Sequence, residues 1–383
     1  MLEPPSTLSV YVHWPFCLAK CPYCDFNSHV RESVDGAAWE SALLKELGFY
    51  LDRAGKREIT TVFFGGGTPS LMPPETVGRI LSKLNLTADA EITLEANPTS
   101  VEAAKLAGFR SAGVSRVSLG VQSLKDDSLK FLGRQHSAKE ALKAVELAAK
   151  IFPRHSIDLI YALPSQTTKS WLLELEEAVS YAGDHISLYQ LTIEQNTNFY
   201  HLYKAGKFVL PEDEIRAEMY EATGDFLAAK GFYAYEVSNY AKAGGESRHN
   251  LTYWRYGDYI GVGPGAHGRF ISNGERYESF NTKSPEKWME SVTTKNHGAE
   301  VLEKITSRTA ATECTLMGLR LAEGLCLESF KTKTGMDFAE VANQEKIKLL
   351  SELGLIEEGQ NRITATPKGF LVLDKITSEI LSS

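Results

Sequence analysis

Short apolar runs rich in β-branched and aromatic residues recur along the first half of the chain, with helix-like apolar spacing between them. These runs predict strands at residues 8–13, 60–64, 91–95, 114–119, 156–163 and 186–193. An amphipathic pattern predicts a helix over residues 39–52, and a further helix is expected to begin near Pro73. Strands that alternate with helices form parallel βαβ units, so this half is predicted to be an α/β domain.

Two α/β folds fit this alternation. Six strand–helix units suit a partial (β/α)6 TIM barrel, whereas an open doubly wound sheet would produce the same pattern. The barrel is favoured because glycine and polar residues follow the C-terminal ends of successive strands. Barrel enzymes build their sites at that end.

The second half has a different character. A helix is predicted over residues 212–230, and residues 233–268, dense in Tyr, Trp, Gly and His, are expected to be irregular and site-forming. Helices at 311–323, 327–334 and 345–352, then a β-pair at 355–356 and 362–364, resemble a winged-helix α+β domain. The expected division is a barrel core at 1–210, a barrel extension at 211–300 and a winged-helix-like C-terminal domain at 301–383.

Composition and charge narrow the class of protein. The formal net charge is −8, which argues against a nucleic-acid protein built on a broad basic face. No apolar run approaches the roughly 18 residues of a membrane helix, and the N-terminal segment lacks the pattern of a signal peptide. A cytoplasmic protein is expected, with any contact to a membrane made through its partners.

Three of the five cysteines lie close together, as Cys17, Cys21 and Cys24 in a Cys-x3-Cys-x2-Cys pattern. Thiolates are the soft ligands that suit iron–sulfur clusters and zinc. Three of them can cap three irons of a cubane cluster and leave the fourth iron open. The alternative is a zinc site completed by His13 or His29, although the chain has no second Cys-x2-Cys pair. The remaining two cysteines, Cys314 and Cys326, are expected to be buried small apolar residues.

Residues at the predicted strand ends are candidates for a ligand site. A glycine run ending in Thr68-Pro69 follows the second strand, where glycine lets the backbone approach a ligand closely. A tight turn would explain the same run. Later strands carry Glu95, Gln122 and Asp158 at or near their ends. These side chains are candidates for ligand binding, and the alternative is that each makes an ordinary strand-end hydrogen bond.

A series of motifs identifies a family. The segments YVHWPFCLAKCPYCDF, FFGGGTPS, LEANP, GVSRVSLGVQS, LGRQHS, IDLIYALP and LTIE resemble the oxygen-independent coproporphyrinogen III dehydrogenase family of radical S-adenosylmethionine (SAM) proteins. The resemblance implies a [4Fe-4S] cluster on Cys17, Cys21 and Cys24, with SAM on the open iron. It implies that cluster and SAM binding also involve Tyr11, Tyr23, Gly66, Gly67, Thr68, Glu95, Gln122, Arg134, Asp158 and Thr192.

Two departures from the dehydrogenase pattern point to another branch of that family. The dehydrogenase motif continues to a fourth cysteine, where this chain has Phe26. Only sixteen residues precede Cys17, too few for the N-terminal extension that covers the dehydrogenase active site. Both features, and the HNxxYW motif that runs from His249 to Trp254, resemble the haem-chaperone branch.

That branch implies that haem is the cargo. His249 would ligate the haem iron while Tyr253 and Trp254 pack on the macrocycle. The alternative is that His249 and Asn250 cap a turn and the aromatic side chains pack under the barrel. His267 is a second possible ligand, with a structural role as its alternative.

The leading hypothesis is therefore haem binding and transfer. The implied partners are haem, haem-acceptor proteins such as membrane respiratory enzymes, and an electron donor for the cluster, without nucleic acid. The alternatives are oxidative decarboxylation of coproporphyrinogen III and radical SAM chemistry on another substrate.

Overall fold

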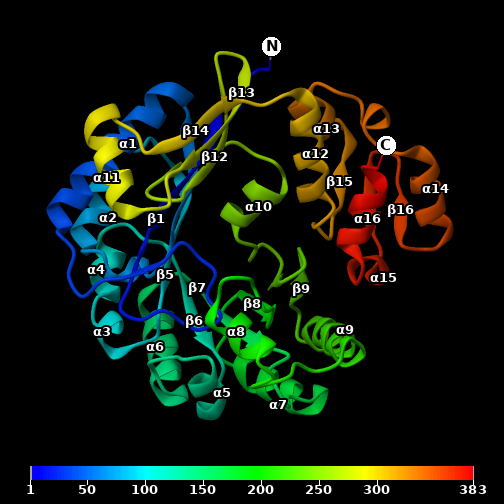
Figure 1. Cartoon of the computed structure of the whole chain (residues 1–383), viewed down its shortest axis with the longest axis horizontal. Coiled ribbons are helices and arrows are strands. Elements are labelled where there is room, and N and C mark those ends of the chain that lie inside the picture. Colours follow the sequence, from blue (N-terminus) through cyan, green and yellow to red (C-terminus); the bar gives the residue numbers. More distant parts are fainter. Residues whose placement is uncertain (1, 383) are drawn as a thin grey trace.

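The computed structural model describes residues 2–382 and contains a curved α/β body beside a smaller C-terminal domain (Figure 1). The strands of the predicted barrel are β1 (Thr7–Trp14), β4 (Glu58–Gly66), β5 (Leu86–Ala96), β6 (Arg116–Gln122), β7 (Arg154–Tyr161) and β8 (His185–Gln190). They are parallel and adjacent in chain order. A doubly wound sheet reverses its strand order part-way. The sequential order therefore confirms the partial barrel.

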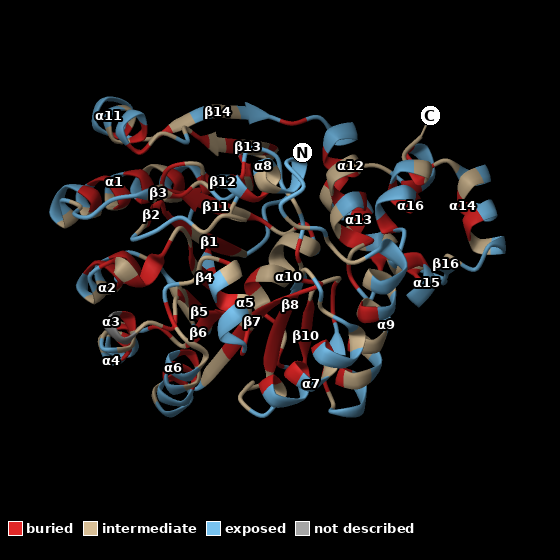
Figure 2. Cartoon of the chain, turned by 60° about the horizontal axis from the view of Figure 1, so that its bottom comes forward, coloured by how far each residue is buried: buried red, intermediate tan, exposed pale blue. Residues whose placement is uncertain are grey.

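Side chains alternate between the two faces of each barrel strand. On β1, Leu8, Val10 and Val12 are buried in the main hydrophobic core. The residue between the first two, Ser9, faces inward and accepts a hydrogen bond from Thr61 of β4. The barrel interior is consequently polar, whereas its outer face is apolar and covered by helices (Figure 2).

The outer layer consists of helices that follow the strands in turn. Their bounds are α1 (Gly36–Ala54), η1 (Pro69–Leu71), α2 (Pro74–Leu81), α3 (Ser100–Ala103), α4 (Leu106–Ser111), α5 (Asp126–Phe131), α6 (Ala138–Ile151) and α7 (Thr168–Val179). Ser137 and Glu140 form a capping box that fixes the start of α6. Further helices are α8 (Asn198–Lys204), α9 (Asp213–Ala229) and α11 (Pro285–Lys295).

Three barrel strands, β6, β7 and β8, end at other residues than the sequence pattern predicts. Strand β6 continues to Gln122, whose φ of 68° turns the chain. Strand β7 stops at Tyr161 because Ala162 has a φ of 57°, so the predicted continuation to residue 163 is wrong. Strand β8 ends at Gln190, which leaves Thr192 in the following loop.

Residues 233–268 are only partly irregular, so that prediction is wrong for about half of the segment. They form β9 (Tyr233–Ala234), β10 (Asn239–Ala241), α10 (Arg248–Trp254), β11 (Tyr259–Val262) and the start of β12 (His267–Ser272). Strand β11 pairs in parallel with the free edge of β1. The sheet then continues through β12 to the antiparallel β13 (Glu275–Asn281) and β14 (Ala299–Lys304). These strands form because they pair with the edge of a strand that is distant in the sequence. A local sequence pattern does not reveal such pairing.

The C-terminal domain has its own hydrophobic core. Its elements are α12 (Ser307–Gly318), β15 (Leu325–Cys326), α13 (Leu327–Thr334), η2 (Phe338–Glu340), α14 (Gln344–Glu352), β16 (Ile356–Glu358), β17 (Arg362–Ala365), α15 (Pro367–Phe370) and α16 (Leu373–Ile380). Helices packed on the antiparallel order β15-β17-β16 give the expected winged-helix-like α+β arrangement. The first helix starts after the cap Thr306 and ends at Gly318, earlier than predicted.

Tyr256 is one of the side chains that join the two parts of the molecule. Tyr256, which follows α10, packs in the C-terminal core, and its hydroxyl donates to Glu313 of α12 over 2.7 Å. The domain boundaries near residues 210 and 300 stay predictions. In the described part of the chain, no helix has the length and apolar character needed to cross a membrane.

Candidate metal and cofactor site

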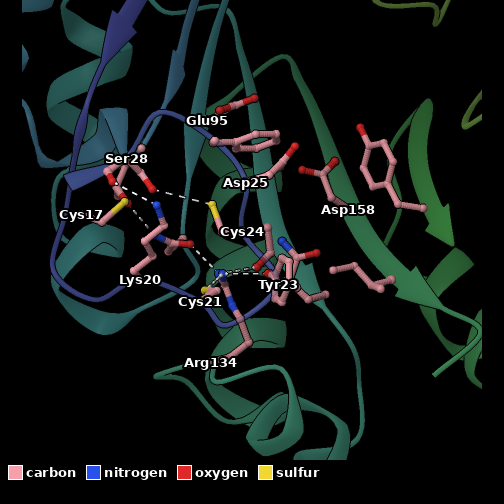
Figure 3. A pocket seen from close by; sticks show the side chains of 18 of the residues that line it. Cys17, Lys20, Cys21, Tyr23, Cys24, Asp25, Ser28, Glu95, Arg134 and Asp158 are labelled. Carbon is pink, nitrogen blue, oxygen red and sulfur yellow. Dashed lines mark hydrogen bonds between the residues drawn. The ribbon is translucent and has the colours of Figure 1, made fainter. Parts of the chain in front are cut away.

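The three clustered cysteines lie in the loop that follows β1. Cys17 belongs to the short strand β2 (Phe16–Cys17), which pairs with β3 (His29–Val30), and Cys21 and Cys24 follow it in the loop. All three are free thiols and are partly buried. Each Sγ has a polar neighbour: Thr68 Oγ1 donates to Cys17 over 3.3 Å, an Arg134 nitrogen donates to Cys21 over 3.3 Å, and Ser28 Oγ lies 3.7 Å from Cys24 (Figure 3).

The glycine run at the end of β4 packs directly against this loop. The amides of Gly67 and Thr68 donate to the carbonyls of Trp14 and Phe16. A Cβ on Gly67 would lie 2.8 Å from the Phe16 carbonyl oxygen, a backbone atom that cannot move aside without shifting the loop. Glycine is therefore required here for the close approach of two backbone segments.

A cavity of about 360 Å³ opens beside the cysteines. It is lined by Cys17, Cys21, Cys24, Tyr23, Gly66, Gly67, Thr68, Glu95, Gln122, Arg134, Asp158 and Thr192, together with residues that the sequence motifs had not singled out. Tyr11 does not line the cavity. Its hydroxyl instead pairs with His13 Nδ1 at 2.9 Å, on the inner face of β1. The structure thus gathers the family's expected cluster and SAM residues in one pocket, apart from Tyr11.

Two carboxyl groups, Glu95 and Asp158, also line the pocket, and Asp158 lies across it from Cys17 (Figure 3). Burial, and then the nearby charge of Asp158, raise the pKa of Glu95 to about 8. Burial likewise raises the pKa of Asp158, although hydrogen bonds from Ser118 and Ser187 oppose this shift. Near neutral pH the raised pKa favours the protonated form of Glu95, so its carboxyl can donate to a polar ligand.

Asn97 organises the side of the pocket next to Cys21, and sequence reasoning missed it. Its side-chain oxygen accepts from Arg134, and its side-chain nitrogen donates to Thr68 Oγ1 over 3.2 Å. Arg134 also donates to the Gly120 carbonyl over 3.0 Å and lies 3.4 Å from the Tyr23 hydroxyl. Asn97 comes two residues after Glu95 in the LEANP motif, so the strand period of two was the available signal.

The donor set fits a cluster rather than a single ion. Among residues 2–382, no three His, Cys, Asp or Glu side chains are placed to share one metal ion. The two histidines of the zinc alternative have other partners: His13 Nε2 pairs with the Asn27 carbonyl at 2.9 Å, and His29 Nε2 pairs with Asn27 Oδ1 at 3.1 Å. A cubane cluster needs one thiolate on each of three irons, which suits cysteines distributed along a loop.

Comparison with known proteins decides the family. A sequence model described as the Radical SAM superfamily matches residues 11–177, and one described as the HemN C-terminal domain matches residues 305–372. The protein named Heme chaperone HemW of Haemophilus influenzae is 37% identical, over 98% of this chain and 98% of that protein. The chain belongs to the HemW-like radical SAM proteins.

Other relatives of this HemW-like chain extend the likeness. The mitochondrial Radical S-adenosyl methionine domain-containing protein 1 of Bos taurus is 40% identical, over 98% of this chain and 87% of that protein. The solved structure of the radical SAM enzyme coproporphyrinogen III oxidase (HemN) from Escherichia coli matches with a TM-score of 0.83 at 22% identity. The match covers 99% of this chain and 91% of that one, which shows the same fold.

The HNxxYW motif forms helix α10, and its histidine points into the barrel. His249 is fully buried. Its Nδ1 pairs with Thr61 Oγ1 at 2.7 Å, and its Nε2 pairs with the hydroxyl of Tyr253, one turn along the helix, also at 2.7 Å. Burial lowers the pKa of His249 to about 3, which keeps the imidazole neutral. Both ring nitrogens are therefore engaged by the protein.

The last residue of the motif lies on another side of α10. Trp254 faces the C-terminal domain, where the Arg320 guanidinium lies 4.8 Å from its ring. Asn250 donates to the Tyr235 hydroxyl over 3.3 Å. The structure therefore brings His249 and Tyr253 together inside the barrel and separates Trp254 from them. His267, the second possible ligand, is exposed at the start of β12 and lies against the Phe280 ring.

Proposed function

We propose that this HemW-like protein binds haem and passes it to acceptor proteins, while its cysteine pocket holds a [4Fe-4S] cluster and SAM. The observation that carries the proposal is the full-length likeness to a protein named Heme chaperone HemW, at 37% identity over 98% of both chains. The haem acceptors proposed from the sequence are membrane respiratory enzymes, and an electron donor would serve the cluster.

The pocket residues suggest how the two cofactors would be held. Cys17, Cys21 and Cys24 would each bind one iron, and the fourth iron would take SAM. When bound, this pair supplies one-electron chemistry. The Gly66–Thr68 segment beside Cys17 would meet the amino end of SAM, because its backbone groups line the cavity there. The polar residues of the other walls, Glu95, Gln122, Arg134, Asp158 and Thr192, would bind the ribose and the carboxylate.

Position 26 supports haem transfer over porphyrinogen oxidation. The dehydrogenase pattern places a cysteine there, whereas Phe26 of this chain lines the mouth of the cluster pocket with 62% of its surface exposed. An apolar ring at this position cannot supply the thiolate of the dehydrogenase motif. Substitution by Cys at this one position therefore offers a direct comparison of the two patterns.

Haem ligation by His249 stays a prediction, and the structure adds a condition to it. Because both ring nitrogens are hydrogen-bonded and the side chain is buried, iron could reach the imidazole only if one bond broke and α10 moved. Tyr253 would then be freed together with His249, since the two share a bond. Helix α10 is short, which limits the number of contacts that such a movement must break.

Two measurements test the proposal. Haem titration followed at the Soret band should show stoichiometric binding by the wild-type protein and a weaker, altered spectrum for His249→Ala. Anaerobic incubation of the reconstituted protein with SAM, reductant and coproporphyrinogen III should yield no protoporphyrinogen, for wild type or Phe26→Cys. No haem binding by wild type would refute haem transfer, and protoporphyrinogen formation by wild type would favour the dehydrogenase alternative.

A further inference from the structure

A second large cavity lies at the end of the barrel opposite the cysteine pocket. Its volume is about 530 Å³, and we call it the basal cavity. Residues at the beginning of β1 and β4 line one side, in contrast to the strand ends that line the cysteine pocket. Helix α10 contributes Arg248, Leu251 and Thr252, and Arg255 follows the helix directly. Helix α13 of the C-terminal domain contributes Thr332 and Lys333. Pockets of about 300–1,000 Å³ are typical of sites for small molecules.

The basal cavity is rich in cationic side chains, although the chain as a whole is acidic. Arg248, Arg255, Arg276 and Lys333 line it, together with Glu3 and Asp258. Arg248 pairs with Asp89, Arg255 with Glu323 and Arg276 with Asp258, whose second oxygen binds Arg57. Among these lining cations, Lys333 is left without a carboxylate partner in the described chain, which suits an anionic ligand.

Lys333 is the cation with the fewest partners. Within residues 2–382, no carboxylate lies within ion-pair distance of its ammonium group, which donates only to the backbone carbonyl of Arg255. It is partly buried, and burial lowers its pKa, with the charges of Arg276 and Arg255 acting in the same direction. An ammonium group that is partly desolvated and lacks a counter-ion would be stabilised by an incoming carboxylate.

The basal cavity adjoins the HNxxYW motif through one hydrogen bond. Thr61 and Ser9 line the cavity, and Thr61 Oγ1 is the partner of His249 Nδ1. Ser9 in turn lies 3.0 Å from Thr252 Oγ1 of α10. A ligand in the cavity would therefore contact the residues that hold His249 in place. It would do so without passing through the cysteine pocket at the other end of the barrel.

A smaller cavity of about 200 Å³ lies on the other side of the same two cations. Arg255 and Lys333 line both cavities, and the smaller one adds Trp254 and Arg362. The two side chains thus separate a space next to His249 from a space next to Trp254. Movement of Arg255 and Lys333 would connect the cavities beside both ends of the HNxxYW motif.

We infer that haem enters at the basal cavity, with one propionate carboxylate paired to Lys333 and the other competing with Glu323 for Arg255. This inference rests on the proposed function, since it assigns the anionic part of the same cargo. It places the haem site and the SAM pocket at opposite ends of the barrel. A pair between an ionised propionate and an ammonium or guanidinium group is charge-assisted.

The test compares haem with its dimethyl ester, in which both carboxylates are masked. Wild-type protein should bind haem about tenfold more tightly than the ester in the same mixed solvent. Lys333→Met should weaken haem binding by about the same factor and leave ester binding unchanged. The matched control is Lys331→Met on the same helix, whose ammonium already pairs with Asp337 at 2.8 Å on the surface. That control should bind both ligands like wild type.

Two further outcomes separate this inference from the proposed function. If wild type binds neither haem nor the ester, haem transfer itself fails. If wild type binds haem and the ester equally, or if Lys333→Met behaves like Lys331→Met toward both, the basal-cavity inference is overturned while haem binding stands. The ester comparison on wild type needs no variant, and Arg255→Gln provides a second variant if Lys333→Met does not fold.

Discussion

His249 Nδ1 and Thr61 Oγ1 share a 2.7 Å hydrogen bond that fixes the HNxxYW helix to the second barrel strand. Thr61 also donates to Ser9 of β1 over 2.8 Å, so this threonine connects two strands and α10 inside the barrel. The His249 ring lies against Phe63 of the same strand, with 5.1 Å between ring centroids. The motif histidine is thereby held as part of the polar barrel interior.

Replacement of Thr61 by Val tests this bond. The variant should lose about 1–2 kcal/mol of unfolding free energy, because a buried imidazole nitrogen is left without its partner. Haem should associate faster with the folded variant, since opening α10 then breaks one bond fewer. Urea unfolding and stopped-flow Soret measurements check both effects. The control is Thr93→Val, a buried threonine of β5 whose hydroxyl has no hydrogen-bond partner among the described residues. Slower haem association with Thr61→Val would contradict the requirement for opening.

The pH dependence of stability should reveal the buried state of His249. Its pKa in the folded protein is lowered to about 3, below the ordinary value of 6.5. The unfolded state therefore binds the proton first, and the stabilising contribution is complete above pH 6.5 and declines as the pH falls toward 3. His249→Asn removes this titration, so its unfolding free energy should decline less steeply than that of wild type over this window. Parallel curves for the two proteins would show that His249 is not buried as a neutral group.

Loss of one cluster ligand should abolish the cluster. Cys21→Ala leaves two thiolates for a group that needs three, so the reconstituted variant should lack the broad [4Fe-4S] absorbance and bind little iron. Cys326→Ala, in the C-terminal domain, is the control and should retain full iron content. A Cys21→Ala protein with wild-type iron and absorbance would show that the ligand assignment is wrong.

Asn97 should act on the pocket through its neighbours. Asn97→Ala removes the acceptor of Arg134 and a donor to Thr68, so Arg134 should hold Cys21 and Tyr23 less firmly. We expect SAM binding, followed by calorimetry under anaerobic conditions, to weaken several-fold while the thermal midpoint changes by only a few degrees. Thr99→Ala in the same loop is the control, since Thr99 pairs with Glu102 outside the cysteine pocket. Unchanged SAM binding by Asn97→Ala would limit Asn97 to a structural role.

Local features of the sequence predicted the barrel and most of the cysteine pocket. Each barrel strand is an apolar run that pairs with its neighbour in the chain, so sequence order and spatial order coincide. Glu95, Gln122 and Asp158 lie at or near the same end of consecutive strands, so strand order predicted their convergence. Tyr23, Arg134 and Thr192 lie in loops and were indicated by the family resemblance instead. Tyr11 was the exception, because its place within β1 turns its hydroxyl toward His13 rather than the cavity.

Residues 233–268 could not be predicted in the same way. Strand β11 exists because the edge of β1 was free to pair with it, although about 250 positions separate partners such as Ser9 and Tyr259 in the chain. Glycine is frequent in this segment and has a low preference for both helix and strand, so the local pattern suggested irregular structure. Long-range pairing outweighed those preferences.

The spacing of Cys17, Cys21 and Cys24 and the glycine run were enough to predict a loop of thiols beside a close backbone approach. The state of the HNxxYW motif, in contrast, depends on the packing of distant segments. The burial of His249 depends on Thr61, 188 positions earlier in the chain, and the cationic cavity depends on Lys333 of another domain. Local spacing specifies which side chains share a helix face, whereas the partner of that face is set by the packing of distant segments.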